Sequence, residues 1–312
     1  MIKRTLYFGN PAYLRCRNDQ LEISLPEAID VTKGFTFSKG ETFPVSTTIP
    51  IEDIGVVILD ESRVTVTHHL MHKLLENNVA LIICDDKHLP TGLMLNLNGN
   101  TVQQERFEAQ IGVSLPLKKQ LWAQTIETKI ANQAAVLKKH GIKHDNMLYW
   151  ASSVKSGDSE NHEARAAAYY WQNIIPTELQ FTREREGVYP NNLLNYGYSL
   201  LRAITARSLV GSGLMPTLGI HHHNRYNAYC LADDIMEPYR PYIDILVFSI
   251  MKKIQPIEEL TKDIKTQLLS VPTIDVFING QASPLMVAMQ QTTASLAKCF
   301  LGETRKIAYP EI

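Results

Sequence analysis

Cysteine is scarce in this sequence of 312 residues, which has only Cys16, Cys84, Cys230 and Cys299. No two of them have the C-x-x-C spacing, and this excludes a zinc ribbon or a thioredoxin-like motif. A few widely scattered thiols are typical of a cytosolic protein whose cysteines stay reduced.

Long apolar segments are also missing. The longest run, residues 245–251, is interrupted by Ser249 and is too short to span a bilayer. The first eight residues, MIKRTLYF, lack the apolar core of a signal peptide. We therefore expect a cytoplasmic protein without a membrane role.

The chain has no excess of positive charge, because 31 lysines and arginines face 32 aspartates and glutamates. A protein that binds duplex DNA usually carries a basic excess. Any nucleic-acid surface must therefore be built from local clusters such as residues 118–119 or 138–139, or be shared among several chains of a complex.

The first hundred residues have the pattern of short strands. Aromatic and β-branched residues gather in short segments between turn signals, at residues 3–8, 13–17, 20–24, 55–60, 79–84 and 93–97. Residues 67–76 instead repeat their apolar side chains as a helix with one buried face does.

From Thr101 onward the periodicity is helical. Helices are expected over residues 117–140, 158–173, 191–210, 241–253 and 286–300. Asn279-Gly280 is a candidate hairpin turn, and residues 302–312 have the pattern of a tail. The sequence thus predicts an α+β fold, with a small β-rich N-terminal domain over residues 1–99 and a larger all-α domain over residues 100–312.

Residues that suit metal chemistry are crowded into two neighbouring stretches, GIHHHNR at residues 219–225 and LADDIMEPYRP at residues 231–241. Imidazole and carboxylate together suit a divalent cation such as Mn²⁺ or Mg²⁺. The nearby arginines suit an anionic substrate, most often a phosphate. The stretches predict metal-assisted chemistry on a phosphate ester.

A further acid lies upstream in NHEARAAAYYW, residues 161–171. Ser159, or alternatively Asp158, is placed to cap the helix that starts there. Glu163 would then lie in the first or second helical turn.

Together, these motifs carry a resemblance to a known family. Residues 161–169, residues 219–222 after the helix NYGYSLLRA, and residues 231–241 have its order and spacing. Over essentially its full length the chain resembles the CRISPR-associated spacer-acquisition integrase/endonuclease family, the universal adaptation integrase of bacterial adaptive immunity. The shorter form from type II systems fits best, and the β-then-α layout agrees.

The resemblance implies a catalytic metal site made of Glu163, His222 and Glu237, with Mg²⁺ or Mn²⁺ as the cofactor. His222 is chosen because the family's histidine falls three residues after the glycine, here Gly219. His221 and His223 remain alternatives.

Two aspartates accompany these ligands. Asp234 lies one helical turn before Glu237 on the same face, so it is a candidate outer partner or alternate ligand. Asp233 is expected to cap a helix or to pair with Arg225 or Arg240.

The resemblance also implies the reaction and the partners. Members insert short DNA duplexes into a repeat array when a DNA 3′-hydroxyl attacks a phosphodiester. They act as homodimers through the β-rich domain, in a heterohexamer with a small ferredoxin-like adaptation protein, and in type II systems with the effector nuclease and an accessory protein. Candidate contacts to DNA phosphates are Arg165, Arg202, Arg207, Arg225 and Arg240.

Two other functions stay open at this point. The same site would serve a stand-alone metal-dependent nuclease that cuts branched DNA in repair. Alternatively, the chain would be a non-catalytic scaffold that binds DNA with an idle site.

Overall fold

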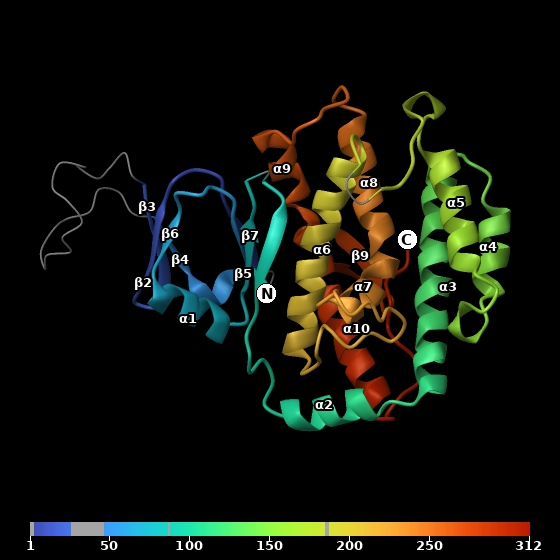
Figure 1. Ribbon diagram of the computed structural model, residues 1–312, viewed down its shortest axis with the longest axis horizontal. Coiled ribbons are helices and arrows are strands. Elements are labelled where there is room, and N and C mark those ends of the chain that lie inside the picture. The colour runs from blue at the N-terminus through green and yellow to red at the C-terminus, as the bar shows by residue number, and fades with distance from the viewer. Residues whose placement is uncertain (1–2, 26–46, 87, 185–186) are drawn as a thin grey trace, which may run out of the picture. The chain divides into compact units, whose positions relative to one another are not determined.

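Strands and helices are segregated along the chain, which confirms the predicted α+β class (Figure 1). The computed structural model describes residues 3–25, 47–86, 88–184 and 187–312. Its contacts divide the chain into two compact units, Met1–Leu97 and Asn98–Ile312. No helix within the described ranges is long and apolar enough to cross a membrane.

The first unit contains a sheet of order β1-β5-β7-β8. Its strands are β1 (Arg4–Phe8), β5 (Ile54–Leu59), β7 (Ala80–Cys84) and β8 (Pro90–Met94). The first three run parallel, and β8 pairs antiparallel with β7. The last strand was expected at residues 93–97 but lies at Pro90–Met94. It pairs antiparallel with β7, and Met94 already lies opposite Leu81, so residues after Met94 would extend past the start of β7 at Ala80.

A second sheet in this unit has the order β4-β3-β2-β6. Its strands are β4 (Thr47–Pro50), β3 (Gln20–Ser24), β2 (Tyr13–Arg17) and β6 (Thr65–Val66). Helix α1 (His68–Glu76) starts at Thr67, whose hydroxyl accepts a hydrogen bond from the Leu70 amide. The helix buries Leu70 and Leu74 in a core shared with both sheets.

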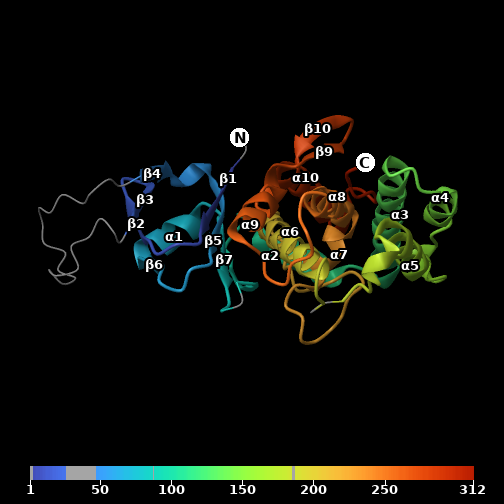
Figure 2. The same ribbon diagram turned by 90° about the horizontal axis from the view of Figure 1, so that it is seen from above.

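The second unit is mainly helical. Its elements are α2 (Gln103–Gly112), α3 (Leu115–Lys139), α4 (Asp145–Ser152), α5 (His162–Ile174), α6 (Asn191–Gly211), α7 (Cys230–Met236), the short 3-10 turn η6 (Glu237–Tyr239), α8 (Arg240–Met251), α9 (Lys262–Leu268), β9 (Asp275–Ile278), β10 (Gln281–Pro284) and α10 (Leu285–Phe300). Figures 1 and 2 show α3 beside α4 and α5, and α6 beside α8 and α10. Helix α3 also packs on η6, which places it at the centre of the site described below.

The hairpin predicted at Asn279-Gly280 joins β9 to β10. Both turn residues have positive φ, 52° for Asn279 and 78° for Gly280, as a tight two-residue turn requires. The following helix α10 is the one expected from residue 286.

Residues 302–312 are anchored to α3, so the expectation of a tail is wrong. The Tyr309 hydroxyl lies 2.8 Å from Thr125 Oγ1, and the Ile312 amide donates to Asn132 Oδ1 at 3.1 Å. Asn132 also donates to the Pro310 carbonyl at 3.0 Å. Polar side chains on the buried face of α3 therefore hold the segment in place.

A buried carboxylate joins the helices around the site. Asp244 of α8 accepts hydrogen bonds from Tyr170 of α5 at 3.0 Å and from Tyr198 of α6 at 2.5 Å. Burial raises the pKa of Asp244 to about 6, although the two tyrosine hydroxyls and Arg240 oppose the shift. The Asp244 contact that joins α5, α6 and α8 therefore makes the stability of the fold depend on pH.

Because the pKa of Asp244 is higher in the folded than in the unfolded chain, this group stabilises the fold at acid pH. That contribution is lost as pH rises from about 4 to about 6. Relative to Asp244→Asn, we expect the wild type to lose up to roughly 3 kcal/mol over that window. Urea unfolding of both proteins at each pH measures the difference. Asp275→Asn replaces an exposed aspartate and keeps Asp244, so its stability should follow pH in parallel with the wild type. Parallel curves for the wild type and Asp244→Asn would refute the argument.

Candidate active site

The first acid of the predicted site stands at the start of α5. Both oxygens of Asp158 cap this helix, accepting the His162 and Glu163 amides at 2.9 Å each. Of the two proposed caps, Asp158 is therefore the one used. The cap fixes the first turn of α5 and thereby the backbone from which Glu163 projects.

The loop after α6 is gathered around Asp234, which is fully buried in α7. Asp234 Oδ2 accepts the Ile220 amide at 2.7 Å and the His221 amide at 2.9 Å. Its Oδ1 lies 2.5 Å from Nδ1 of His222. Gly219 permits this tight loop, because a Cβ there would collide with the carbonyl oxygen of His222.

This arrangement gives Asp234 the position of an outer partner. With Nδ1 of His222 bound to a carboxylate, the proton is held on that nitrogen and Nε2 is left as the acceptor or ligand atom. The hydrogen bond that His222 donates to Asp234 raises the pKa of His222 against the opposing effect of burial, and the charges of Glu237 and Glu163 add to it. The His222 side chain remains 45% exposed, so a substrate can reach it.

The second acid, Glu237, lies in η6 between α7 and α8 and is only 3% exposed. Its Oε1 is 2.9 Å from Arg240 Nη2, and its Oε2 is 2.7 Å from Lys129 Nζ. Burial would raise the pKa of Glu237, but the neighbouring Arg240 and Lys129 outweigh it and hold that pKa below its usual value. Glu237 is therefore an ionised acid inside the unit.

Lys129, from the middle of α3, connects the two acids. Its ammonium lies 2.7 Å from Glu163 Oε1 as well as 2.7 Å from Glu237 Oε2. Those two oxygens can therefore be at most 5.4 Å apart, twice that distance. Burial would lower the pKa of Lys129, but Glu237 and Glu163 raise it, so the ammonium stays charged.

The three adjacent histidines have different surroundings. The His221 ring stacks on the buried Trp122 of α3, with centroids 4.0 Å apart and planes 2° from parallel. Trp122 also meets the His222 ring edge-on at 5.7 Å. His223 is exposed. The stacking positions the loop, and of the three imidazoles it is His222 that Asp234 orients.

The donor set fits a hard divalent cation. The carboxylates of Glu163 and Glu237 already flank one cation, the Lys129 ammonium, and the oriented imidazole of His222 lies near them. Carboxylate oxygens and an imidazole nitrogen are ligands that Mn²⁺ and Mg²⁺ accept. As the side chains stand, no three His, Cys, Asp or Glu residues in the described ranges are gathered closely enough to hold a metal ion. The ammonium of Lys129 occupies the space between the two acids.

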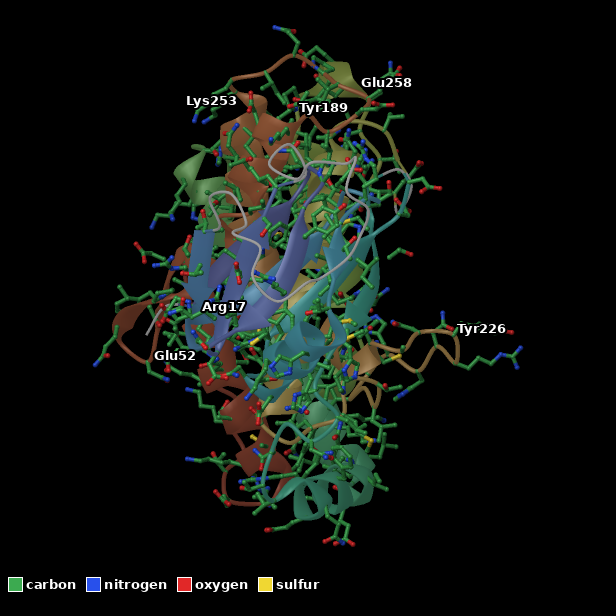
Figure 3. All side chains as sticks on the ribbon, turned by 90° about the vertical axis from the view of Figure 1, so that its left-hand side faces the viewer. Arg17, Glu52, Tyr189, Tyr226, Lys253 and Glu258 are labelled. Atoms are coloured by element: carbon green, nitrogen blue, oxygen red, sulfur yellow. The ribbon has the colours of Figure 1, made fainter. Side chains whose placement is uncertain are left out.

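The five arginines named as phosphate contacts lie in different settings. Arg165 is exposed on α5, with its guanidinium over the Trp150 ring. Arg225 is exposed on the loop after His222 and stacks on Tyr226, which Figure 3 shows at the tip of that loop. Both can meet an incoming anion.

The other three arginines are engaged inside the unit. Arg202 forms two bonds to Asp233, at 2.6 and 3.1 Å, so the expected pairing of Asp233 with Arg225 or Arg240 is wrong. Arg240 pairs with Glu237. Arg207 is 2% exposed in α6, which removes its guanidinium from the surface.

Two residues central to this geometry, Lys129 and Trp122, were not predicted. The sequence contained a signal for Lys129, because it falls on the apolar face of its helix with Trp122, Ile126 and Ile130. A lysine on the apolar face of a helix is unusual unless an acidic side chain pairs with it in the fold. The partner acids come from distant segments, so the pattern alone could not name them.

Solved structures share the fold of this chain. A casposase bound to integration product matches with a TM-score of 0.74 at 21% identity, covering 98% of this chain and 92% of that one. A Cas1 protein from Thermotoga maritima matches with a TM-score of 0.71 at 14% identity, covering 96% and 97%. A Cas6-RT-Cas1–Cas2 complex matches with a TM-score of 0.70 at 18% identity, covering 98% of this chain and 36% of that one.

Sequence relatives identify the family. Residues 8–279 match the family described as CRISPR associated protein Cas1. A CRISPR-associated endonuclease Cas1 from Neisseria meningitidis is 35% identical over 270 residues, covering 86% of this chain and 88% of the relative. One from Pyrobaculum aerophilum is 25% identical over 266 residues, covering 80% and 88%. The chain belongs to the Cas1 family, which confirms the resemblance carried by the three motifs.

The role of Asp234 can be tested against its neighbour in sequence. Asp234→Asn keeps the shape of the side chain but removes its charge, so the pKa of His222 should fall. NMR titration of the His222 ring measures this shift. Asp233→Asn, which disturbs the pair with Arg202 instead, should leave the His222 pKa in place. An unchanged His222 pKa in Asp234→Asn would contradict the assignment.

Proposed function

We propose that this chain is a metal-dependent DNA integrase and endonuclease that inserts new spacer DNA into a CRISPR repeat array. The observation that carries the proposal is the convergence of Glu163 and Glu237 on one cation, with His222 oriented beside them by Asp234. Membership of the Cas1 family supports the DNA substrate and the reaction class.

Glu163, His222 and Glu237 are the residues that would hold Mg²⁺ or Mn²⁺. When bound, such an ion stabilises charge on the attacking and leaving oxygens of a phosphodiester. No nucleophilic side chain is required, because the attacking group is a 3′-hydroxyl of the incoming DNA, or water when the enzyme hydrolyses instead.

The chain's own residues bind and orient. Asp234 keeps the proton of His222 on Nδ1, and Arg240 holds the oxygen of Glu237 that Lys129 does not contact. The exposed Arg225 and Arg165 would take DNA phosphates through charge-assisted hydrogen bonds. The half-exposed His222 marks the side from which the phosphodiester approaches.

We further propose that residues 1–99 form the homodimer contact and that residues 100–312 carry catalysis. The proposed partner is the small ferredoxin-like adaptation protein, in a heterohexamer. Several chains of that complex would together supply the positive charge for DNA binding, because this chain has no basic excess of its own. One solved structure with this fold contains Cas1 together with Cas2. Contacts with the effector nuclease and accessory protein of a type II system belong to the same proposal.

Strand transfer into supercoiled repeat DNA, measured with and without the small partner, tests the function. Glu163→Gln, His222→Ala and Glu237→Gln should each lower the yield of joined product by about 100-fold or more, and chelation of divalent metal should abolish it. Glu160→Gln is a matched control, since Glu160 is an exposed acid on the same segment that pairs with Lys155.

The other two functions give different results in the same assay. Efficient cutting of branched DNA by this protein alone, with no joining to a repeat, would identify a repair nuclease. Binding of DNA without any metal-dependent product would identify a scaffold. Undiminished joining in all three site variants would overturn the assignment of the site.

A further inference from the structure

Lys129 is the only described side chain shown bridging Glu163 and Glu237, and its position is unusual for a lysine. The residue projects from the buried stripe of α3, and its side chain is 10% exposed. Its ammonium contacts both acids at the same distance, 2.7 Å. A buried lysine is retained in a fold only where opposite charges compensate for its lost hydration.

The two acids depend on this ammonium when no metal is bound. Their nearest oxygens lie within 5.4 Å of each other, since each is 2.7 Å from Lys129 Nζ. Like charges at that separation repel strongly where water is largely excluded. Glu237 is almost completely buried, so solvent screens it little.

A metal and the ammonium compete for the same atoms. Both oxygens of Glu237 are in ion pairs, Oε1 with Arg240 and Oε2 with Lys129. Arg240 is three residues from Glu237 and is held over the Tyr198 ring at 4.8 Å, whereas among the described residues Lys129 forms ion pairs with the two acids alone. A cation that enters between the acids therefore displaces Lys129 rather than Arg240.

We propose that Lys129 is a built-in counter-cation that holds Glu163 and Glu237 together in the metal-free protein and competes with the divalent metal for them. This inference rests on the proposed metal site. Lys129 is thus a positioning residue that keeps metal affinity low until other negative charge is present. The phosphates of bound DNA supply such charge, so metal and DNA are expected to bind cooperatively.

The test measures Mn²⁺ binding to the purified full-length protein without DNA. Binding is measured by calorimetry and, independently, by the EPR signal of free Mn²⁺. Lys129→Met keeps the length and apolar stem of the side chain but removes its charge. We expect it to bind Mn²⁺ about tenfold or more tightly than the wild type. The metal-free variant should also melt at a lower temperature than the wild type, and Mn²⁺ should raise its melting temperature by more.

Two control variants separate charge from packing. Lys138→Met removes an exposed lysine from the end of the same helix and should leave Mn²⁺ affinity and melting temperature unchanged. Lys129→Arg keeps the positive charge and should show no gain in affinity. If Lys129→Met does not fold without metal, folding restored by Mn²⁺ supports the proposal, and otherwise the affinity of Lys129→Gln decides it.

The outcomes distinguish this inference from the proposed function. If neither the wild type nor Lys129→Met binds Mn²⁺, or if Glu163→Gln binds it as well as the wild type does, the metal site itself is wrong. If the wild type binds Mn²⁺ at a site that Glu163→Gln removes, while Lys129→Met binds it no more tightly, then only the counter-cation role is overturned. Weaker binding by Lys129→Met would mean that the lysine assists the metal instead of competing with it.

Discussion

Negative charge buried among the helices is the constraint on which the rest of the second unit depends. Each buried acid must find compensation, because an unpaired carboxylate in the interior is very costly. Glu237 is compensated by two cations, Asp234 by backbone amides and an imidazole, and Asp244 by two tyrosine hydroxyls. Because the partners come from α3, α5, α6 and the loop after α6, satisfying these acids fixes how those elements meet.

The three buried acids, Asp234, Asp244 and Glu237, are compensated by different kinds of partner. Most hydrogen bonds to Asp234 come from backbone amides, which hold its carboxylate in one place. Asp244 is bound by neutral donors and keeps a raised pKa. Glu237 is balanced by two charged side chains, Lys129 and Arg240. The acid held by side chains, Glu237, is the one for which we propose a role in metal binding.

The sequence predicted the parts of this arrangement that are local. Periodicity located α3, α6, α8 and α10 to within a few residues, and Asn279-Gly280 identified its hairpin because positive φ is a property of the residues themselves. The helices α2, α4 and α9 were not predicted. Helix α2 buries only Gln110, so it has no apolar face to recognise, and α4 and α9 are too short for a repeat to stand out. The segment after Gly302 has the sequence pattern of a tail because its anchors, Thr125 and Asn132, lie far away in the chain.

The same distinction applies to the site. Through the family resemblance, three motifs indicated Glu163, His222 and Glu237 as candidate ligands, but the order and spacing of motifs carry no information on which cation faces which acid. Asp233 was therefore assigned to a nearby arginine, whereas the fold brings it Arg202 from another helix. Arg207 was named as a phosphate contact on charge alone, and its burial in α6 became visible only with the packing around it.

The stack of Trp122 on His221 has a consequence for spectroscopy. The chain has three tryptophans, and Trp150 and Trp171 lie on α4 and α5, so Trp122 is the indole in direct contact with the histidine loop. Indole emission is quenched by an adjacent protonated imidazole and recovers when the ring loses its proton or turns away. The protein therefore contains its own fluorophore at the site, which reports on the loop without any attached label.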